Sequence, residues 1–278
     1  MTANSPTGSP IERIGRVMTT NNRVIFIESA ILFLVFWQIA VPALGVAEFF
    51  STPIVVATGM YKILFVTGEA WPDLLATTRR IVLAFAFTML VGTTIGVIMG
   101  ITRFWKKILT YYVTMMLSIP GLIAAVFSAM LLGLSDLTPM LATMLMTTPL
   151  ISITVRDSVQ DVDPNLFEMS GAFDVPRHRT IWRVVVKSIA PALFGTARYA
   201  FAVAWKITNL TEVIIADVGI GYRIRFFFNR FDTTGILMYV LLLSLLILII
   251  EFGVLRQIEK RVFAHREQIS IGFGGTGA

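Results

Sequence analysis

The segment from residue 190 to 216 carries charged side chains inside an otherwise apolar stretch, APALFGTARYAFAVAWKITNLTEVIIA. On a helix with 100° per residue, one face of this segment spans an arc of about 80° and is polar. Its members are Arg198, Ala202, Trp205, Asn209 and Glu212. Ionisable groups at membrane depth usually face a bundle interior or a water-filled cavity and favour a functional role. We therefore predict that Trp205, Asn209 and Glu212 line or gate a path through a membrane.

Lys206 lies roughly 100° from Trp205 around the same helix, and two roles for it stay open. If it faces the path, its ammonium group would attract an anionic or carboxylate-bearing solute. Alternatively, Lys206 is the structural counter-ion of Glu212. Arg198 lies near one end of the segment, where its long side chain could reach the membrane surface.

Residues that could catalyse a reaction or bind a metal are scarce. The chain has no cysteine and only two histidines, His178 and His265, which lie in basic sequence rather than among carboxylates. It has no G-x-x-x-x-G-K-[ST] loop for a nucleotide, and neither Ser118 nor Ser128 lies in a G-x-S-x-G setting. We expect no catalytic residue, metal site or cofactor in this chain, so any ATP and magnesium must bind to another subunit.

The polar segment from 156 to 190 predicts two short helices joined by a tight corner. Asp163-Pro164 is typical of a helix start, which predicts a first helix over about 164–173. Asp174-Val175-Pro176 should end it, because Asp tolerates the left-handed region and Pro disfavours helix at the residue before it. A second helix would follow from Arg177 until Pro191 opens the next apolar segment. This pattern alone fits equally well a pair of helices lying on lipid.

The elements that carry these residues are predicted from the distribution of charge. Of 278 residues, 56% are hydrophobic and only 14% are charged. Five uncharged or nearly uncharged runs approach or exceed the roughly 20 residues that a membrane-spanning helix needs. With the 190–216 segment, they predict an all-α membrane protein with six spans in one domain over 24–262. The expected spans are about 24–47, 79–102, 108–134, 137–155, 190–216 and 234–255.

Basic residues predict the orientation of these spans. With the N-terminus in the cytoplasm, fifteen basic residues fall in inside segments and six in outside segments. The sequence therefore predicts that both ends are cytoplasmic, with flexible tails over 1–23 and 263–278. The net charge of +6 follows from this topology, and we expect no nucleic-acid partner. Pro120, Pro139 and Pro149 should bend the third and fourth spans, and a helix begun at Thr52-Pro53 should lie at the outer face.

The stretch from 168 to 191 resembles the EAA loop of bacterial binding-protein-dependent ABC transporter permeases. Glu168 matches the Glu of the motif, while Met169 and Ser170 replace its two Ala residues. Asp174 stands where the family has Gly, a substitution that still permits a turn. The continuation is matched by Arg177, Trp182-Arg183, Val184-Val185 and Pro191.

A second set of fragments resembles the nitrate, sulfonate and taurine-type branch of that family. Ala204-Trp205, Glu212 and Gly219-Ile220-Gly221-Tyr222 match its AW…AE…GLGY pattern. Thr52-Pro53, the LLATTRR sequence over 74–80 and Ser118-Ile119-Pro120 fit the same branch. The likeness covers residues 50 to 262 in the expected order.

The resemblance implies a type I ABC importer (MetI-like) permease fold in the bacterial cytoplasmic (inner) membrane. Its partners would be a separate cytoplasmic ATPase, an extracytoplasmic solute-binding protein, a second permease chain in a homodimer, and membrane lipid. The 164–188 loop would be the coupling element, and the solute path would include Ser118, Pro120, Trp205, Lys206, Asn209 and Glu212. The residues expected to contact the ATPase are Glu168, Phe173, Asp174, Val175, Pro176 and Arg177.

An alternative of another class is an ion-coupled secondary transporter. In that reading Lys206, Glu212 and Asp217 would relay an ion or a proton across the membrane. The solute itself stays open, as does the choice between two identical permease chains and two different ones.

Overall fold

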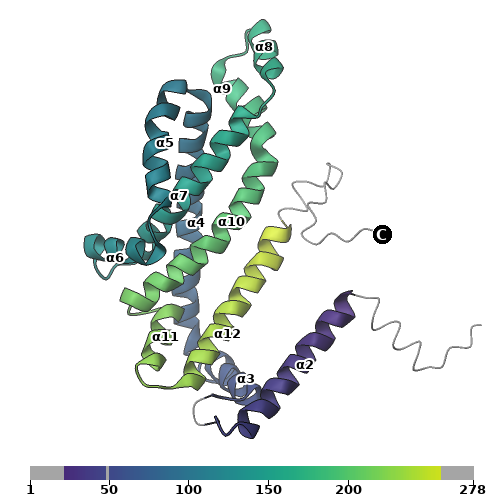
Figure 1. Ribbon diagram of the computed structural model, residues 1–278, viewed down its shortest axis with the longest axis vertical. Coiled ribbons are helices and arrows are strands. Elements are labelled where there is room, and N and C mark those ends of the chain that lie inside the picture. The colour runs from purple at the N-terminus through teal and green to yellow at the C-terminus, as the bar shows by residue number, and fades with distance from the viewer. Residues whose placement is uncertain (1–21, 48–49, 258–278) are drawn as a thin grey trace, which may run out of the picture.

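The computed structural model describes residues 22–47 and 50–257, and within these ranges the chain is helical with no strand (Figure 1). The predicted tails over 1–23 and 263–278 lie almost entirely outside the described residues. The α-helices are α2 (Asn22–Ala43), α3 (Pro53–Tyr61), α4 (Ala70–Ile101), α5 (Arg103–Leu117), α6 (Gly121–Leu132), α7 (Leu137–Gln160), α8 (Pro164–Ala172), α9 (Arg177–Thr180), α10 (Val186–Ile215), α11 (Ile220–Phe228) and α12 (Thr233–Ile250). Three π-helical turns are η1 (Lys62–Val66), η2 (Ile181–Val185) and η3 (Glu251–Leu255).

The all-α membrane class is confirmed. Among the described residues, four helices are long and apolar enough to cross a membrane: Val24–Ala43, Ala70–Ile101, Leu137–Gln160 and Thr233–Gly253. The bent pair α5 and α6 makes five if it is one span. Helix α10 is 30 residues long but falls outside this apolar set. The count of six spans therefore stays a prediction.

Several predicted boundaries are wrong. The third span is not one helix, because α5 and α6 meet at an angle of 101° across residues 118–120. Pro120 has an extended backbone there and is the N-cap residue of α6, directly before its first turn. Helix α4 begins at Ala70 rather than near 79, so Arg79 and Arg80 lie well inside the helix rather than at its start.

Pro191 does not open a new segment. It lies inside α10, and helix continues from Arg177 through the η2 turn to Ile215. Membrane helices tolerate an internal proline where neighbouring groups satisfy the freed backbone. The second helix of the polar loop and the fifth predicted span therefore form one continuous helix.

Helices α4 and α7 approach each other closely through three glycines spaced four residues apart. A Cβ atom added to Gly92, Gly96 or Gly100 would lie 2.6–2.8 Å from an atom of α7. At Gly96 that atom is the backbone oxygen of Ser152, at 2.7 Å. Small residues allow such contact between membrane helices, where packing rather than water exclusion drives association.

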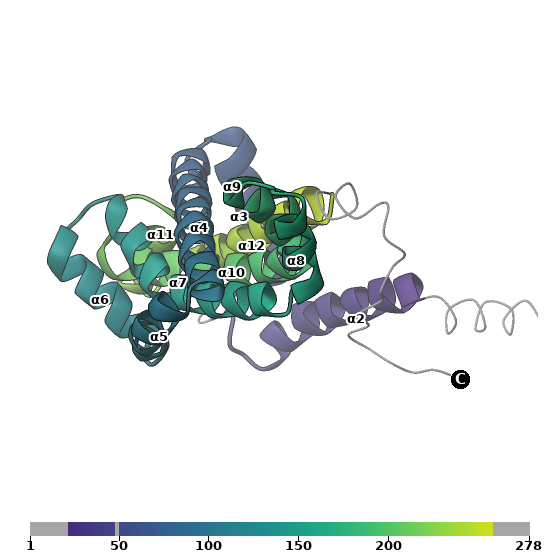
Figure 2. The ribbon, with the colours of Figure 1, turned by 90° about the horizontal axis from the view of Figure 1, so that it is seen from above.

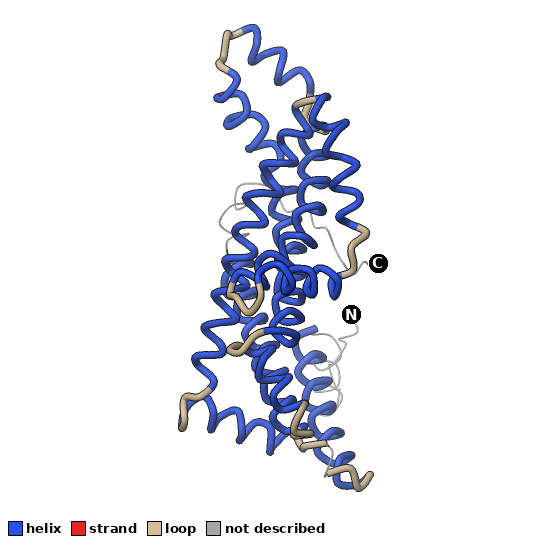
Figure 3. The backbone as a smooth tube through the Cα atoms, turned by 90° about the vertical axis from the view of Figure 1, so that its left-hand side faces the viewer, coloured by secondary structure: helices blue, strands red, loops and turns tan. Residues whose placement is uncertain are grey.

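Different elements form the two ends of the molecule. Figures 1 and 3 place the α8–α9 corner at one end, and Figure 1 places α3 and α11 towards the other. Figure 2 shows α2 diverging from the bundle on one side and α6 projecting on the other. Only 6% of the apolar window of α2 is buried, which leaves its side chains for lipid or another chain.

We expect Gly96→Leu to destabilise the protein, because the added side chain meets backbone that cannot move aside. The cost should reach at least about 1–3 kcal/mol, the usual penalty of overpacking. Thermal unfolding in mild detergent measures it. The matched control is Gly195→Leu in α10, where an added Cβ has no atom within 4 Å. Equal unfolding temperatures for the two variants would contradict the close α4–α7 contact.

Candidate functional site

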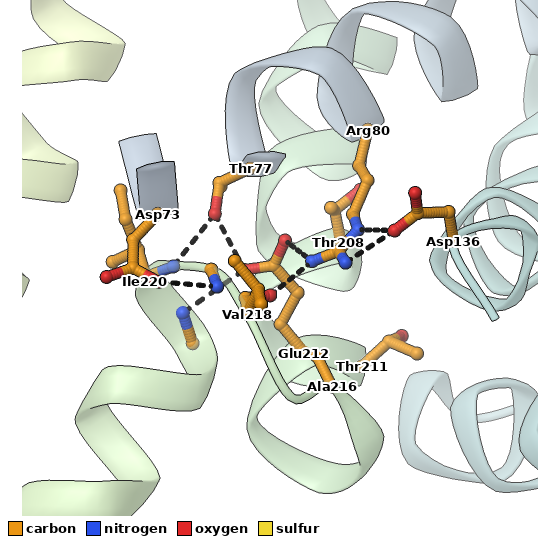
Figure 4. A network of polar contacts seen from close by, with 12 residues as sticks. Asp73, Thr77, Arg80, Asp136, Thr208, Thr211, Glu212, Ala216, Val218 and Ile220 are labelled. Atoms are coloured by element: carbon orange, nitrogen blue, oxygen red, sulfur yellow. Dashed lines mark hydrogen bonds and ion pairs between the residues drawn. The ribbon is translucent and has the colours of Figure 1, made fainter. Parts of the chain in front are cut away.

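Glu212 on α10 is fully buried and accepts three hydrogen bonds (Figure 4). Arg80 Nη1 donates to Oε1 at 2.8 Å, and Thr77 Oγ1 donates to Oε2 at 2.8 Å. The backbone N–H of Gly221 donates to Oε2 at 3.1 Å. Of the two roles left open for Lys206, that of counter-ion of Glu212 is therefore wrong, since the counter-ion is Arg80 on α4.

The Arg80 guanidinium connects four parts of the chain. Besides Glu212, its Nη1 donates to the backbone oxygen of Val218 at 2.6 Å. Its Nε and Nη2 donate to Asp136 Oδ1 at 2.9 and 2.5 Å, and Arg79 pairs with the same carboxylate. The hydrogen bond from Arg80 holds the pKa of the Asp136 carboxyl below its ordinary value. One side chain thus ties α4 to α10, to the turn before α11 and to the start of α7.

Helix α11 is anchored at its first turn by side chains of α4. The buried Asp73 carboxylate accepts from Gly219 N at 2.9 Å and from Arg223 Nε at 2.7 Å. The N–H of Ile220 donates to Thr77 Oγ1 at 2.9 Å. These acceptors satisfy N–H groups that a helix start leaves without intrahelical partners. We call Asp73, Thr77, Arg80, Asp136, Glu212 and the 218–221 turn the polar clasp.

Two glycines allow the 218–221 turn to reach the Glu212 carboxylate. Gly219 has φ 128, a region that favours glycine, and a Cβ there would lie 2.8 Å from Glu212 Oε2. A Cβ at Gly221 would lie 2.6 Å from Glu212 Cβ. Glycine is needed at both positions because the backbone of the turn lies against the Glu212 side chain.

The sequence reading missed Asp73, Thr77, Arg80 and Asp136 as site residues. The predicted 79–102 span puts Arg80 at its very start, where a basic residue counts only towards the orientation of the spans. The spacing of residues 73, 77 and 80 was a usable signal, because it places three polar side chains on one face of a helix. Thr77 and Arg80 also lie within the 74–80 fragment already noted.

The predicted path residues on α10 have different environments. Trp205 is partly buried and packs against hydrophobic clusters, whereas Lys206 is exposed with Nζ 5.7 Å from the Trp205 ring centre. Asn209 is partly buried, and its Oδ1 has no hydrogen-bond partner within the described structure. Arg198 pairs with Glu251 at 2.6 Å, which fits a structural role.

The bend between α5 and α6 lies against the same stretch of α10. Ser118 and Pro120 are exposed at this bend. A Cβ at Gly121 would lie 2.8 Å from Ile207 Cδ1, so the bend contacts the residue next to Lys206. The structure thus brings the predicted residues 118 and 120 close to the middle of α10, while Glu212 is separate and enclosed in the clasp.

The corner between α8 and α9 has the predicted geometry. Asp163 Oδ1 accepts from Asn165 N at 2.9 Å and caps the start of α8. At the other end, Asp174 has φ 46, its N–H donates to Gly171 O at 3.1 Å, and Val175 N donates to Ser170 O at 3.0 Å. This pair of bonds is a Schellman cap, whose left-handed position usually holds Gly.

The corner presents apolar side chains on a stiff support. Phe173 is 77% exposed, and Glu168, Val175 and Pro176 are also exposed. Ser170 Oγ and Thr180 Oγ1 share a hydrogen bond of 2.5 Å that ties α8 to α9. Arg177 begins α9, but its side chain lies outside the described part of the chain. An exposed apolar surface on two helices joined by a hydrogen bond is typical of a site that contacts another protein.

Residues 92–263 match the model of the family described as binding-protein-dependent transport system inner membrane component. Because the match covers more than half of the chain, the protein belongs to this family. Its members are multi-pass membrane components of ABC transporters and are not enzymes, since ATP hydrolysis takes place on a separate subunit.

Curated relatives are distant but span most of the chain. The taurine transport system permease protein TauC of Escherichia coli (strain K12) is 22% identical over 84% of this chain and 86% of its own. The aliphatic sulfonates transport permease protein SsuC of Bacillus subtilis (strain 168), a putative assignment, is 24% identical over 68% of each chain. The nitrate import permease protein NrtB of Synechocystis sp. is 21% identical over 72% and 69%. The chain is a permease of the nitrate, sulfonate and taurine branch.

We expect Arg80→Ala to destabilise the protein severely, because it leaves the Glu212 carboxylate buried without a counter-ion. Breaking a buried pair from one side costs about 3–5 kcal/mol. Arg79→Ala, which removes an exposed partner of Asp136, should cost under about 1 kcal/mol. The double variant Arg80→Met with Glu212→Leu should recover much of the loss. Unfolding titrations in micelles compare the variants, and equal costs at 79 and 80 would disprove the central place of Arg80.

Proposed function

We propose that this chain is the membrane-spanning half of an ATP-driven importer for a small anionic solute, driven by a separate ATPase through the 164–188 loop. The observation that carries the proposal is the corner at Asp174. The Schellman cap at Asp174 leaves Phe173 and Val175 exposed at the corner, and the hydrogen bond between Ser170 and Thr180 joins α8 to α9 beneath them. A rigid apolar projection of this kind fits a groove on a partner that moves during its own catalytic cycle.

The contact with the ATPase would be made by Glu168, Phe173, Asp174, Val175, Pro176 and Arg177. The continuous helix from Arg177 to Ile215 supports a mechanical role, since a push on the corner acts directly on the 30-residue α10. A solute-binding protein would deliver the solute at the opposite end. The predicted orientation agrees, because the corner lies in the basic segment expected in the cytoplasm.

The solute path would run past the α5–α6 bend and Lys206. Broken helices in transporters direct the N-terminal ends of half-helices towards anionic groups of the substrate. Helix α6 begins at such a break, and its contact with Ile207 lies next to the exposed Lys206. The names of the relatives specify taurine, aliphatic sulfonates and nitrate, which supports an anionic solute.

Two copies of the chain would enclose this path in the bacterial inner membrane. Lys206, Ser118 and Pro120 are exposed in the single chain, so a second copy is needed to surround them. The side chains of α2, of which few are buried in the single chain, offer further surface to lipid or to that copy. The alternative ion relay through Lys206, Glu212 and Asp217 loses support, because Glu212 is enclosed by Arg80 and Thr77 while Asp217 is exposed.

Asp174→Pro should uncouple the transporter while leaving membrane insertion intact. Proline lacks the N–H that binds Gly171 O, and its φ of about −65° excludes the left-handed cap. Co-purification with the ATPase should fall severalfold, and solute uptake with it. Asp174→Gly is the control and should assemble normally, because glycine adopts the left-handed region freely. Normal ATPase association of Asp174→Pro would refute the coupling role of the corner.

Lys206→Met should weaken the uptake of an anionic solute if Lys206 faces the path. Loss of one direct charge contact predicts roughly a tenfold rise in the solute concentration needed for half-maximal uptake. Proteoliposomes holding the full complex, tested with taurine, an alkanesulfonate and nitrate, give this value. Lys62→Met, an exposed lysine outside the proposed path, should behave as wild type. Unchanged uptake and affinity for Lys206→Met would remove Lys206 from the path.

A further inference from the structure

A cavity of about 390 Å³ lies beside the polar clasp. One wall is made by Arg80 and by residues 215–217 at the end of α10. The other is made by the 134–136 turn and Pro139 at the start of α7. The lining residues thus belong to the elements that Arg80 connects: α4, the end of α10 and the start of α7.

The bonds that Arg80 makes on its two sides differ in exposure. On one side, the guanidinium and the Glu212 carboxylate are 6% and 0% exposed. On the other side, the Asp136 side chain is 47% exposed. A buried ion pair is costly to break, whereas an exposed one contributes little and exchanges readily with water. The bond with Glu212 is therefore the costlier of the two to break, and the bond with the half-exposed Asp136 is the weaker.

The turn that carries Asp136 has its own support and does not need the carboxylate. Ser135 Oγ accepts from Leu137 N at 3.2 Å, and Thr138 Oγ1 donates to Gly133 O at 2.8 Å. The Asp136 side chain makes no capping bond to α7. Gly133, with φ 63, has no atom within 4 Å of an added Cβ, so the turn has room to move. The Asp136 carboxylate therefore does not cap the helix; it pairs with Arg79 and Arg80.

We propose that Arg80 is a positioning residue of a gate, and that its bond with Asp136 is the contact that opens when the permease changes state. Glu212 and the Val218 backbone oxygen hold the guanidinium in place, so that the Asp136 turn can leave and return to the same position. The close α4–α7 contact at Gly92, Gly96 and Gly100 is the fixed point of this movement. The inference builds on the proposed transport function by naming how one side of the path is held shut.

The absence of cysteine allows a direct test of this movement. Leu134→Cys and Asp217→Cys place one spin label on each side of the cavity, and pulsed electron paramagnetic resonance measures their separation in lipid nanodiscs. Three further changes are compared in this background. Asp136→Ala removes the reversible contact, Asp136→Glu preserves the charge, and Glu69→Ala removes an exposed carboxylate outside the clasp.

We expect Asp136→Ala to raise the ratio of long to short label distances roughly two- to fivefold, a shift in a two-state ratio in keeping with the loss of the ion pairs of one half-exposed carboxylate. Asp136→Glu should restore the parent distribution, and Glu69→Ala should not alter it. A distribution unchanged by Asp136→Ala would overturn the gate, even if that variant unfolds at a lower temperature. Failure of the transport proposal is detected separately, as absence of ATP-driven uptake by the unlabelled wild-type complex.

Discussion

The buried ion pair between Arg80 and Glu212 is the constraint around which the end of the molecule remote from the α8–α9 corner is organised. A carboxylate and a guanidinium can be enclosed together only if their remaining hydrogen-bonding positions are also satisfied. Thr77, the Gly221 N–H and the Val218 carbonyl meet that requirement for this pair. Each of them fixes a different part of the backbone. The pair therefore determines where α11 begins and how α4 and α10 lie relative to each other.

The same requirement explains residues that otherwise look unrelated. Gly219 and Gly221 are small because the backbone passes within contact distance of Glu212. Asp73 is buried in α4 because it accepts from Gly219 N and pairs with Arg223. At the other end, Asp174 occupies a left-handed position for a different reason, the Schellman cap of α8. Local backbone geometry and buried charge thus account for both groups of motif residues.

Uncharged run lengths were enough to predict the membrane class, and Asp163-Pro164 and Asp174-Val175-Pro176 were enough to predict the α8–α9 corner. These features depend on residues close together in the sequence. The partner of Glu212 was not predictable from α10 alone, because Lys206 is nearer along the chain than Arg80 and carries the same positive charge. Only the packing of α4 against α10 selects Arg80. The bend at 118–120 was indicated by Pro120, but its angle of 101° depends on how α6 packs against α7 and α10.

Continuity of helix from Arg177 to Ile215 connects the two ends of the protein. An α-helix rises about 1.5 Å per residue, so the 30 residues of α10 extend roughly 45 Å. Had Pro191 ended a helix, a flexible joint would separate the corner from the membrane segment, and movement of the corner would be absorbed there. Because the helix is unbroken at Pro191, a tilt imposed at the corner must move Glu212. Since Glu212 is paired with Arg80, we infer that the same tilt would reach the bond between Arg80 and Asp136.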